Sequence, residues 1–376
     1  MLEPALEYAM AAQDEVRAAR LVARIGQATM NAGRIETLRR WFGWFEERGA
    51  WEAHPRLAAQ AVMAFALDGD LVRSDRWSGP MRVGQPETRD DATGIVAVAR
   101  AFRCQDGVER MHADAGSAVE TLGDEDPFFI AALGLLGMAK ILRGDVEEGA
   151  ACLDRGVALW ERGSVANLAT TLALTQLAGV AMERGDWSLA SVHARRARSI
   201  AMVNGLDEQA AGAAADAVNA RIAAHHGATE QARVDATHAR RLRTLLTPAA
   251  PWLALRVRLD LIRVDLALGD GGGARTLLAE VREILQRRPD MGSLVDEAAE
   301  LEGRVKSLRG GEPGATTLTL AELRLLPLLT THLSFREIGE RLFVSQNTVK
   351  TQAISIYRKL EASSRSEAVA LSLIHI

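Results

Sequence analysis

Apolar residues recur at helical spacing along most of this chain, and glycines interrupt the pattern at regular intervals. Ala- and Leu-rich segments of helical period flank seven glycines that lie 36 to 42 residues apart: Gly33, Gly69, Gly107, Gly144, Gly185, Gly227 and Gly269. Glycine ends a helix readily because it takes a left-handed conformation without steric cost. Each interval therefore predicts a helix hairpin. Because one hairpin cannot bury its own apolar face, residues 1–309 are expected to stack as an all-α solenoid.

Several side chains of these repeats have an expected place in the packing. One helix face combines small and large apolar residues at helical spacing: Ala150, Leu153, Val157 and Trp160. The trio Trp41, Trp44 and Phe45 is expected to pack between hairpins rather than to line an effector pocket. The acidic pairs at 46–47 and 147–148 are expected to be solvated. His225 and His226 predict a solvated helix end rather than a metal site, because no third ligand lies at a usable spacing.

A change in composition marks a domain boundary after the repeats. Residues 310–317 are rich in glycine and contain Pro313, so they predict a flexible linker after a helix over residues 293–308. Residues 318–370 then predict a second domain of short helices. Residues 371–376, which read LSLIHI, are interpreted as an artefactual tail.

Two of the short helices begin with the Ser/Thr-x-x-Glu capping box. Thr319 with Glu322 starts the first helix, and Ser334 with Glu337 starts the second. In such a box each side chain satisfies a backbone donor that the helix end leaves without a partner. Pro327 lies inside the first helix and is expected to kink it, because proline lacks a backbone donor.

The third short helix is expected over residues 346–359, capped by Ser345 after a turn at Phe343 and Val344. One side of it is an apolar stripe formed by Val349, Ala353, Ile356 and Leu360. From position 345 to position 359 the sequence has three cations and no acid. The span from Ser334 to Ala353 therefore predicts a helix-turn-helix motif whose second helix enters the major groove of DNA.

The polar side of this recognition helix carries groups that match DNA. Amides suit adenine, lysine suits guanine acceptors and methyl groups suit thymine, so the candidate base contacts are Gln346, Asn347, Lys350, Thr351 and Ile354. Phosphate contacts set register rather than sequence, and the candidates are Ser345, Thr348, Arg358 and Arg365.

Residues 318–368 resemble the LuxR-type helix-turn-helix of bacterial transcription regulators. The matching positions are Leu318, Thr319, Glu322, Ser334, Glu337, Ile338, Leu342, Val344, Ser345, Thr348, Val349, Lys350, Ile356, Lys359, Leu360, Ser364, Arg365 and Ala368. Gln352 and Glu361 depart from the pattern, where the family often has His and Gly. The resemblance implies a regulator that binds double-stranded DNA, with Lys350 and Thr351 facing the groove. It also implies a last helix, from Ser366 onward, that pairs two copies as a homodimer on DNA.

The repeat region is similar to the tetratricopeptide (TPR) class. It looks more specifically like the helical repeats of MalT-like, large ATP-binding LuxR regulators, which implies that the solenoid binds an effector or a protein partner. Those regulators usually carry an ATPase domain before the repeats, whereas this sequence has no GxxxxGK[ST] motif and its first lysine is Lys140. The chain is therefore interpreted either as a short member or as the C-terminal piece of a longer regulator.

Charge supports a small DNA-binding unit on an acidic body. The formal net charge is −4, and residues 316–376 carry seven cations and five acids, so the preceding 315 residues carry −6.

Cys104 and Cys152 are expected to be buried reduced thiols. The sequence lacks a membrane-spanning apolar run and a signal pattern, so a cytoplasmic protein without a membrane partner is expected. No catalytic, metal-binding or cofactor-binding constellation can be argued, so neither an enzyme nor a cofactor is predicted.

Three alternatives stand beside this interpretation. The short helices could form a bundle without a DNA role, or they could be region 4 of a sigma factor; the sequence over 356–368 and the solenoid argue against the latter. The third alternative is an interaction scaffold, a fragment of a larger regulator whose helix-turn-helix does not bind DNA alone. Salt-sensitive, sequence-dependent DNA binding would separate it from a regulator.

Overall fold

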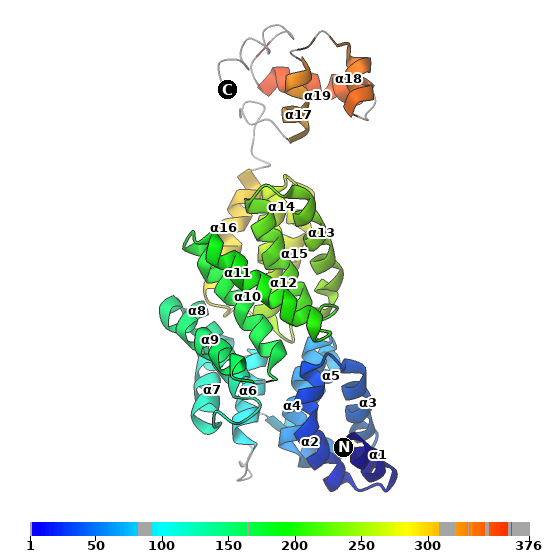
Figure 1. Ribbon diagram of the computed structural model, residues 1–376, viewed down its shortest axis with the longest axis vertical. Helices are drawn as coiled ribbons and strands as arrows, with labels where there is room; N and C mark the ends of the chain where they lie inside the picture. The colour runs from blue at the N-terminus through cyan, green and yellow to red at the C-terminus, as the bar shows by residue number, and fades with distance from the viewer. Residues whose placement is uncertain are drawn as a thin grey trace. The chain divides into compact units, whose positions relative to one another are not determined.

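The computed structural model contains two compact units (Figure 1). The larger comprises Met1–Leu268 and Gly272–Leu301, and the second comprises Gly269–Gly271 and Glu302–Ile376. The structure describes residues 2–81, 92–163, 165–307, 320–329, 331, 333–342, 346–359 and 362. Every regular element in these ranges is a helix, which confirms the all-α fold class. The predicted linker at 310–317 and the tail at 371–376 lie outside the described residues.

Helices of the larger unit follow one another as pairs joined by short turns (Figure 1). In the described ranges the pairs are α2 (Glu15–Asn31) with α3 (Ile35–Glu46), α4 (Pro55–Leu67) with α5 (Leu71–Trp77), α6 (Thr93–Arg103) with α7 (Gly107–Thr121), α8 (Phe129–Arg143) with α9 (Val146–Glu161), α10 (Asn167–Glu183) with α11 (Trp187–Val203), α12 (Ala210–His225) with α13 (Thr229–Leu242), and α14 (Pro251–Ala267) with α15 (Gly271–Arg287). The remaining elements are α1 (Leu2–Ala11), the 3-10 helices η1 (Ala50–Ala53), η2 (Gly79–Met81) and η3 (Arg243–Leu245), and α16 (Ser293–Ser307), whose residues from Glu302 onward belong to the second unit. The predicted row of hairpins is confirmed.

The seven predicted glycines all have φ between 68° and 95°, and six of them lie in the turn inside a pair. The prediction is wrong for Gly107, which is the first residue of α7, because the left-handed cap that ends α6 is Cys104. The N–H of Gly144 donates to the carbonyl of Ile141 at 3.0 Å, and the N–H of Asp145 donates to the carbonyl of Lys140 at 2.9 Å. This Schellman arrangement requires a left-handed residue, which favours glycine. The same two bonds form around Gly185, at 3.0 and 2.9 Å, so the two glycines occupy equivalent turns.

The aspartate that follows several of these glycines begins the next helix. A carboxylate oxygen of Asp186 accepts a hydrogen bond from the N–H of Leu189 at 2.9 Å, and Asp70 accepts one from the N–H of Arg73 at 3.0 Å. Such an N-cap satisfies a backbone donor at the start of the helix. The recurring Gly-Asp pair is therefore the end of one helix and the start of the next.

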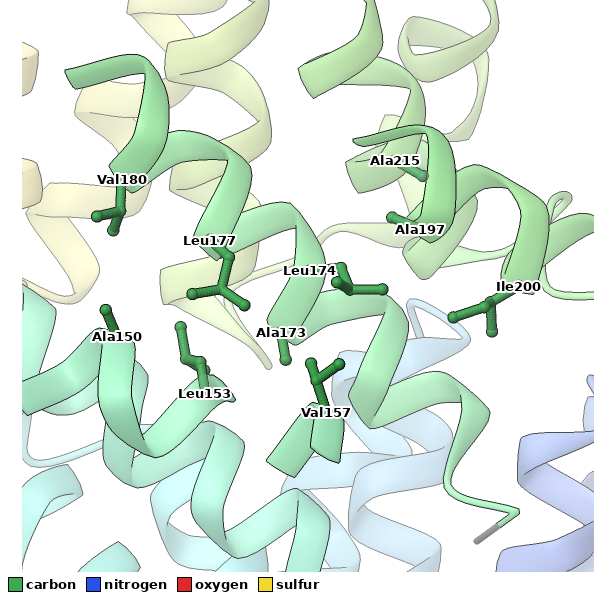
Figure 2. Close-up of a cluster of buried hydrophobic side chains, with 10 residues drawn as sticks. All are labelled: Ala150, Leu153, Val157, Ala173, Leu174, Leu177, Val180, Ala197, Ile200 and Ala215. Atoms are coloured by element: carbon green, nitrogen blue, oxygen red, sulfur yellow. The ribbon is translucent and has the colours of Figure 1, made fainter. Parts of the chain in front are cut away.

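Small residues let neighbouring pairs pack closely. The buried cluster in Figure 2 draws on α9, α10, α11 and α12 and consists of Ala150, Leu153, Val157, Ala173, Leu174, Leu177, Val180, Ala197, Ile200 and Ala215. Trp160 is half-buried and packs against this cluster, which confirms the predicted face of α9. Helices α8 and α9 approach even more closely, because a Cβ added at Gly149 would lie 2.6 Å from the carbonyl oxygen of Gly137.

Hydrogen bonds also join repeats that are far apart in the sequence. Asn31 Oδ1 accepts a hydrogen bond from the backbone N–H of Leu168 at 3.2 Å, which links α2 to the start of α10. Trp252 Nε1 donates to the carbonyl oxygen of Phe102 at 2.9 Å, which links α14 to the end of α6. The row of hairpins in the larger unit therefore turns back on itself, as expected for a superhelix.

The aromatic residues of α3 pack largely as predicted. Trp41 and Phe45 are 1% and 0% exposed, so they belong to the core between hairpins. Trp44 is half-buried, and the guanidinium of Arg48 lies 4.0 Å from the centroid of its ring. These contacts account for the trio by packing.

The prediction of a solvated acidic pair at 46–47 is wrong for Glu46. Its side chain is only 9% exposed, and it forms an ion pair with Arg73 at 3.0 Å. It also accepts a hydrogen bond from the buried indole N–H of Trp77 at 2.8 Å. A buried donor of this kind needs an acceptor, and the end of α3 supplies one. Glu47, Glu147 and Glu148 are exposed as predicted.

The histidines and cysteines that stood out in the sequence have simple surroundings. His225 and His226 are exposed at the end of α12, and the ring of His225 stacks on Trp187 with centroids 3.5 Å apart. Both cysteines are free thiols; Cys104 is buried, which raises its pKa to about 12, whereas Cys152 is only half-buried. No described helix is long and apolar enough to cross a membrane.

Candidate nucleic-acid interface

The described helices of the smaller domain pack around one apolar core. They are α17 (Leu320–Leu329), α18 (Phe335–Leu342) and α19 (Gln346–Lys359). Their buried residues, each at most 1% exposed, are Leu325, Leu329, Ile338, Val349, Ala353 and Ile356. The last three confirm the predicted apolar stripe of the third helix, while Leu360 lies outside the described residues. This core fixes which side of α19 remains accessible.

Helix α18 begins with the predicted capping box. The backbone N–H and the hydroxyl of Ser334 donate to the carboxylate of Glu337 at 2.8 and 2.7 Å, and the N–H of Glu337 donates to the Ser334 hydroxyl at 3.3 Å. These hydrogen bonds from Ser334 lower the pKa of Glu337. The reciprocal pair defines where α18 starts. The side chains of Thr319 and Glu322 and the cap Ser345 lie outside what the structure describes.

Helix α17 continues through Pro327 and ends at Leu329. Pro327 therefore does not end the helix, and the predicted kink stays a prediction. Pro327 lies two residues before the end of α17, and its side chain is exposed, so its ring meets solvent rather than the core.

The side of α19 away from the core carries the candidate base contacts. Gln346, Lys350 and Thr351 are exposed, and Ile354 is 57% exposed. Residues three and four positions apart on a helix are neighbours, so these side chains share one face. Asn347 lies in the same helix, but its side chain is outside the described set. This face therefore presents an amide, an ammonium group, a hydroxyl and an apolar side chain. These groups match the donors, acceptors and methyl groups that base edges expose in a major groove.

The candidate phosphate contacts are less fully described. Thr348 and Arg358 lie within α19 but their side chains are not described, and Ser345 and Arg365 lie outside the described residues altogether. The structure adds two cations that the sequence analysis did not name, the exposed Arg336 and Arg341 of α18. Their signal was available, because the first helix of a helix-turn-helix commonly crosses the DNA backbone.

These features define a class of protein domain. Helices α18 and α19 follow one another in the order that a helix-turn-helix requires, while residues 343–345 between them lie outside the described set, so the predicted span from Ser334 to Ala353 stays a prediction. Such a domain, with a packed back and a polar, cation-bearing front on its last described helix, is built to bind DNA.

Comparison with known families agrees with this class. Residues 316–372 match the model of the luxR family of bacterial regulatory proteins. The chain thus carries a LuxR-family helix-turn-helix domain after a helical N-terminal region, and at the level of the family its function is DNA-binding transcription regulation. A comparison with curated proteins gives no match.

The described residues outside this interface form no candidate metal-binding site. Within the ranges that the structure describes, no three His, Cys, Asp or Glu side chains come together in a group able to hold a metal ion.

Proposed function

We propose that this chain is a sequence-specific transcription regulator in which α19 enters the major groove of double-stranded DNA. The observation that carries the proposal is the exposed face of α19 with Gln346, Lys350, Thr351 and Ile354, set in a domain that matches the luxR family. The buried side of the same helix holds this face rigidly, which favours discrimination between bases.

Each group has a proposed role. Lys350 donates to guanine acceptors, the amides of Gln346 and Asn347 bind adenine, and Thr351 and Ile354 meet thymine methyl groups. Cations outside this face, including Arg358 and Arg365, bind phosphates and fix the register. The proposed location is the bacterial cytoplasm, with the protein on the nucleoid when it is bound to its target DNA.

The repeat unit is proposed to bind an effector or a protein partner. Its similarity to the helical repeats of MalT-like regulators and its superhelical closure, as at Asn31 and Leu168, support this role. The domains are proposed to span 1–309 and 318–370, separated by the linker at 310–317. A homodimer on a dyad-related DNA site follows from the resemblance to LuxR-type regulators.

Binding-site selection followed by titration tests the proposal. Duplexes selected from a random pool by the full chain are compared with scrambled duplexes of the same composition at several salt concentrations, using fluorescence anisotropy. We expect tighter binding to the selected sequence and a fall in affinity with salt for both. Lys306→Ala should bind both duplexes as the wild type does, because Lys306 is 70% exposed on α16, outside the proposed interface.

A purified chain that binds selected and scrambled duplexes equally, or neither, contradicts the proposal. That result favours the alternative of a helical-repeat interaction scaffold whose helix-turn-helix does not bind DNA alone.

A further inference from the structure

One cavity lies inside the larger unit, at the point where the superhelix closes on itself. It is lined by residues of α2, α4, α6, α8, α10 and α14, the first helices of their pairs, and by Leu153 of α9. Its free volume is about 70 Å³. A single water needs roughly 10–15 Å³ on the same measure, so the cavity has room for several atoms beyond one water.

The lining is apolar and uncharged. Leu, Met, Val, Phe and Ala side chains dominate it, and among the described residues no Asp, Glu, Lys, Arg or His contributes. The indole N–H of Trp252 is already bound to the carbonyl of Phe102 at 2.9 Å, so Trp252 presents its ring. Burying a charge here would be costly, because nothing in the lining would pair with it. The lining therefore selects a neutral molecule.

Three amide side chains are the exception: Gln27 and Asn31 of α2, and Gln176 of α10, whose Nε2 already donates to Thr175 Oγ1 at 3.4 Å. Gln27 and Asn31 line the cavity, are 8% and 4% exposed, and lie one helical turn apart. Gln27 Oε1 and Asn31 Nδ2 are both buried without a hydrogen-bond partner among the described residues. Buried polar atoms are normally paired, so these two atoms are available to hydrogen-bond a molecule bound in the cavity.

The neighbours fix which way each amide points. Gln27 Nε2 donates to the carbonyl of Pro127, which can only accept, so Oε1 is the atom left over. Asn31 Oδ1 accepts from the backbone N–H of Leu168, which can only donate, so Nδ2 is left over. The cavity is therefore provided with one spare acceptor and one spare donor on neighbouring positions of one helix face.

We infer that this cavity binds a small, neutral, mainly apolar molecule that carries one hydroxyl group. A hydroxyl donates one hydrogen bond and accepts another, so it satisfies Gln27 Oε1 and Asn31 Nδ2 together while the apolar body meets the rest of the lining. The inference names the chemical class of effector for the repeat unit and so rests on its proposed sensing role.

The walls can adapt to such a molecule. Met30, Met63 and Met138 contribute to the lining, and unbranched methionines change rotamer to fit what they meet. Engineered apolar cavities of ~150 Å³ admit benzene, so a ring of that size would need some methionine movement here. Phenol and benzene are therefore suitable probes, since they differ by a hydroxyl.

Gly134 provides a way to fill the cavity without a clash. It belongs to the lining on α8, and a Cβ added there has nothing within 4 Å. Gly134→Leu should therefore occupy the space. Gly179 of α10 offers the matched control, because a Cβ there also has nothing within 4 Å and Gly179 does not line the cavity.

Calorimetric titration of the full chain, without DNA, tests the inference. Phenol should bind saturably and about tenfold more tightly than benzene, since benzene leaves both polar atoms unpaired. Gly134→Leu should weaken phenol binding at least about tenfold, while Gly179→Leu should leave it unchanged. In Gln27→Met the preference for phenol over benzene should shrink towards one; this ratio does not depend on the variant's stability.

Three results would overturn the inference: no saturable binding of phenol to the wild-type chain, unchanged binding to Gly134→Leu, or an unchanged preference in Gln27→Met. Because DNA is absent from the titration, these results are independent of the test of DNA recognition. Failure of the regulator proposal would appear only as loss of sequence-dependent DNA binding.

Discussion

The carboxylate of Glu337 accepts hydrogen bonds from both the backbone N–H and the hydroxyl of Ser334, at 2.8 and 2.7 Å. Two groups only three positions apart in the sequence thus fix the start of α18. The buried Ile338 follows at once and anchors α18 in the core shared with α17 and α19. The cap therefore helps to set where the proposed recognition helix is held.

Removing this cap should loosen α18. Ser334→Ala is expected to destabilise the helix by about 0.5–2 kcal/mol, because it leaves the backbone N–H of Glu337 without its acceptor. Hydrogen–deuterium exchange of the full chain should then be faster over 335–342 and unchanged over α8. Ser334→Thr is the control, since its hydroxyl preserves the cap; equal acceleration in both variants would show that the box does not matter.

The turn glycines should differ sharply from glycines inside helices. Gly144 has φ of 95°, so Gly144→Ala should destabilise the repeat unit by roughly 1–2 kcal/mol. Gly179→Ala, inside α10 with open space for a Cβ, should stabilise it by about 0.5–1 kcal/mol. Urea unfolding midpoints measure both. Shifts of the same sign would contradict the assignment of Gly144 to a left-handed turn.

The pair of α12 and α13 should be sensitive to pH through His238. Its ring nitrogens hydrogen-bond to Asp216 and, at 3.1 Å, to Glu208. The pKa of His238 is raised, and the hydrogen bond to Asp216 contributes most to this rise. A raised pKa in the folded state means that the stabilisation is complete below the ordinary value of 6.5 and is lost as pH rises through the folded value.

The melting temperature of the wild type should therefore fall, relative to His238→Gln, as pH increases from 6 to 9. His226→Gln, which alters an exposed histidine at the end of α12, should follow the wild type. Parallel curves for wild type and His238→Gln would show that His238 does not cause the pH dependence of the melting temperature.

The two domains should separate on mild proteolysis. Residues 310–317 are predicted to be a flexible linker, so cleavage should occur there before any repeat is cut. The C-terminal fragment, with α17 to α19, should keep its helical circular dichroism. Early cleavage within α2 to α15, or unfolding of the released fragment, would contradict the domain division.

The sequence was informative where a local rule decides the structure. A left-handed turn favours glycine, so Gly144 and Gly185 could be placed at equivalent turns from spacing alone. The capping box at Ser334 and the buried stripe at Val349 and Ala353 follow from equally local patterns. The candidate base contacts also follow, because the stripe defines the opposite face.

Long-range partners could not be predicted in this way. Glu46 looked solvated because its acceptor role depends on Trp77, which another hairpin places beside it. Gln27 and Asn31 lie in the cavity wall because α2 meets α10, and Asn31 and Leu168 are 137 positions apart. Two amides one turn apart in an otherwise apolar helix face were the available signal, but the closure that buries them comes from the stacking of many repeats.

The central claim is that α19 reads bases, and Lys350 tests it most directly. Wild type, Lys350→Ala and the control Lys306→Ala are each used to select sites from randomised duplexes, and the base preference at every position is compared. The account predicts that Lys350→Ala loses preference at one or two adjacent positions and weakens binding to the selected site by roughly 1–3 kcal/mol. Arg365→Ala should instead weaken selected and random DNA alike and flatten the salt dependence. An unchanged motif for Lys350→Ala, with equal loss on selected and random DNA, would contradict base reading by α19.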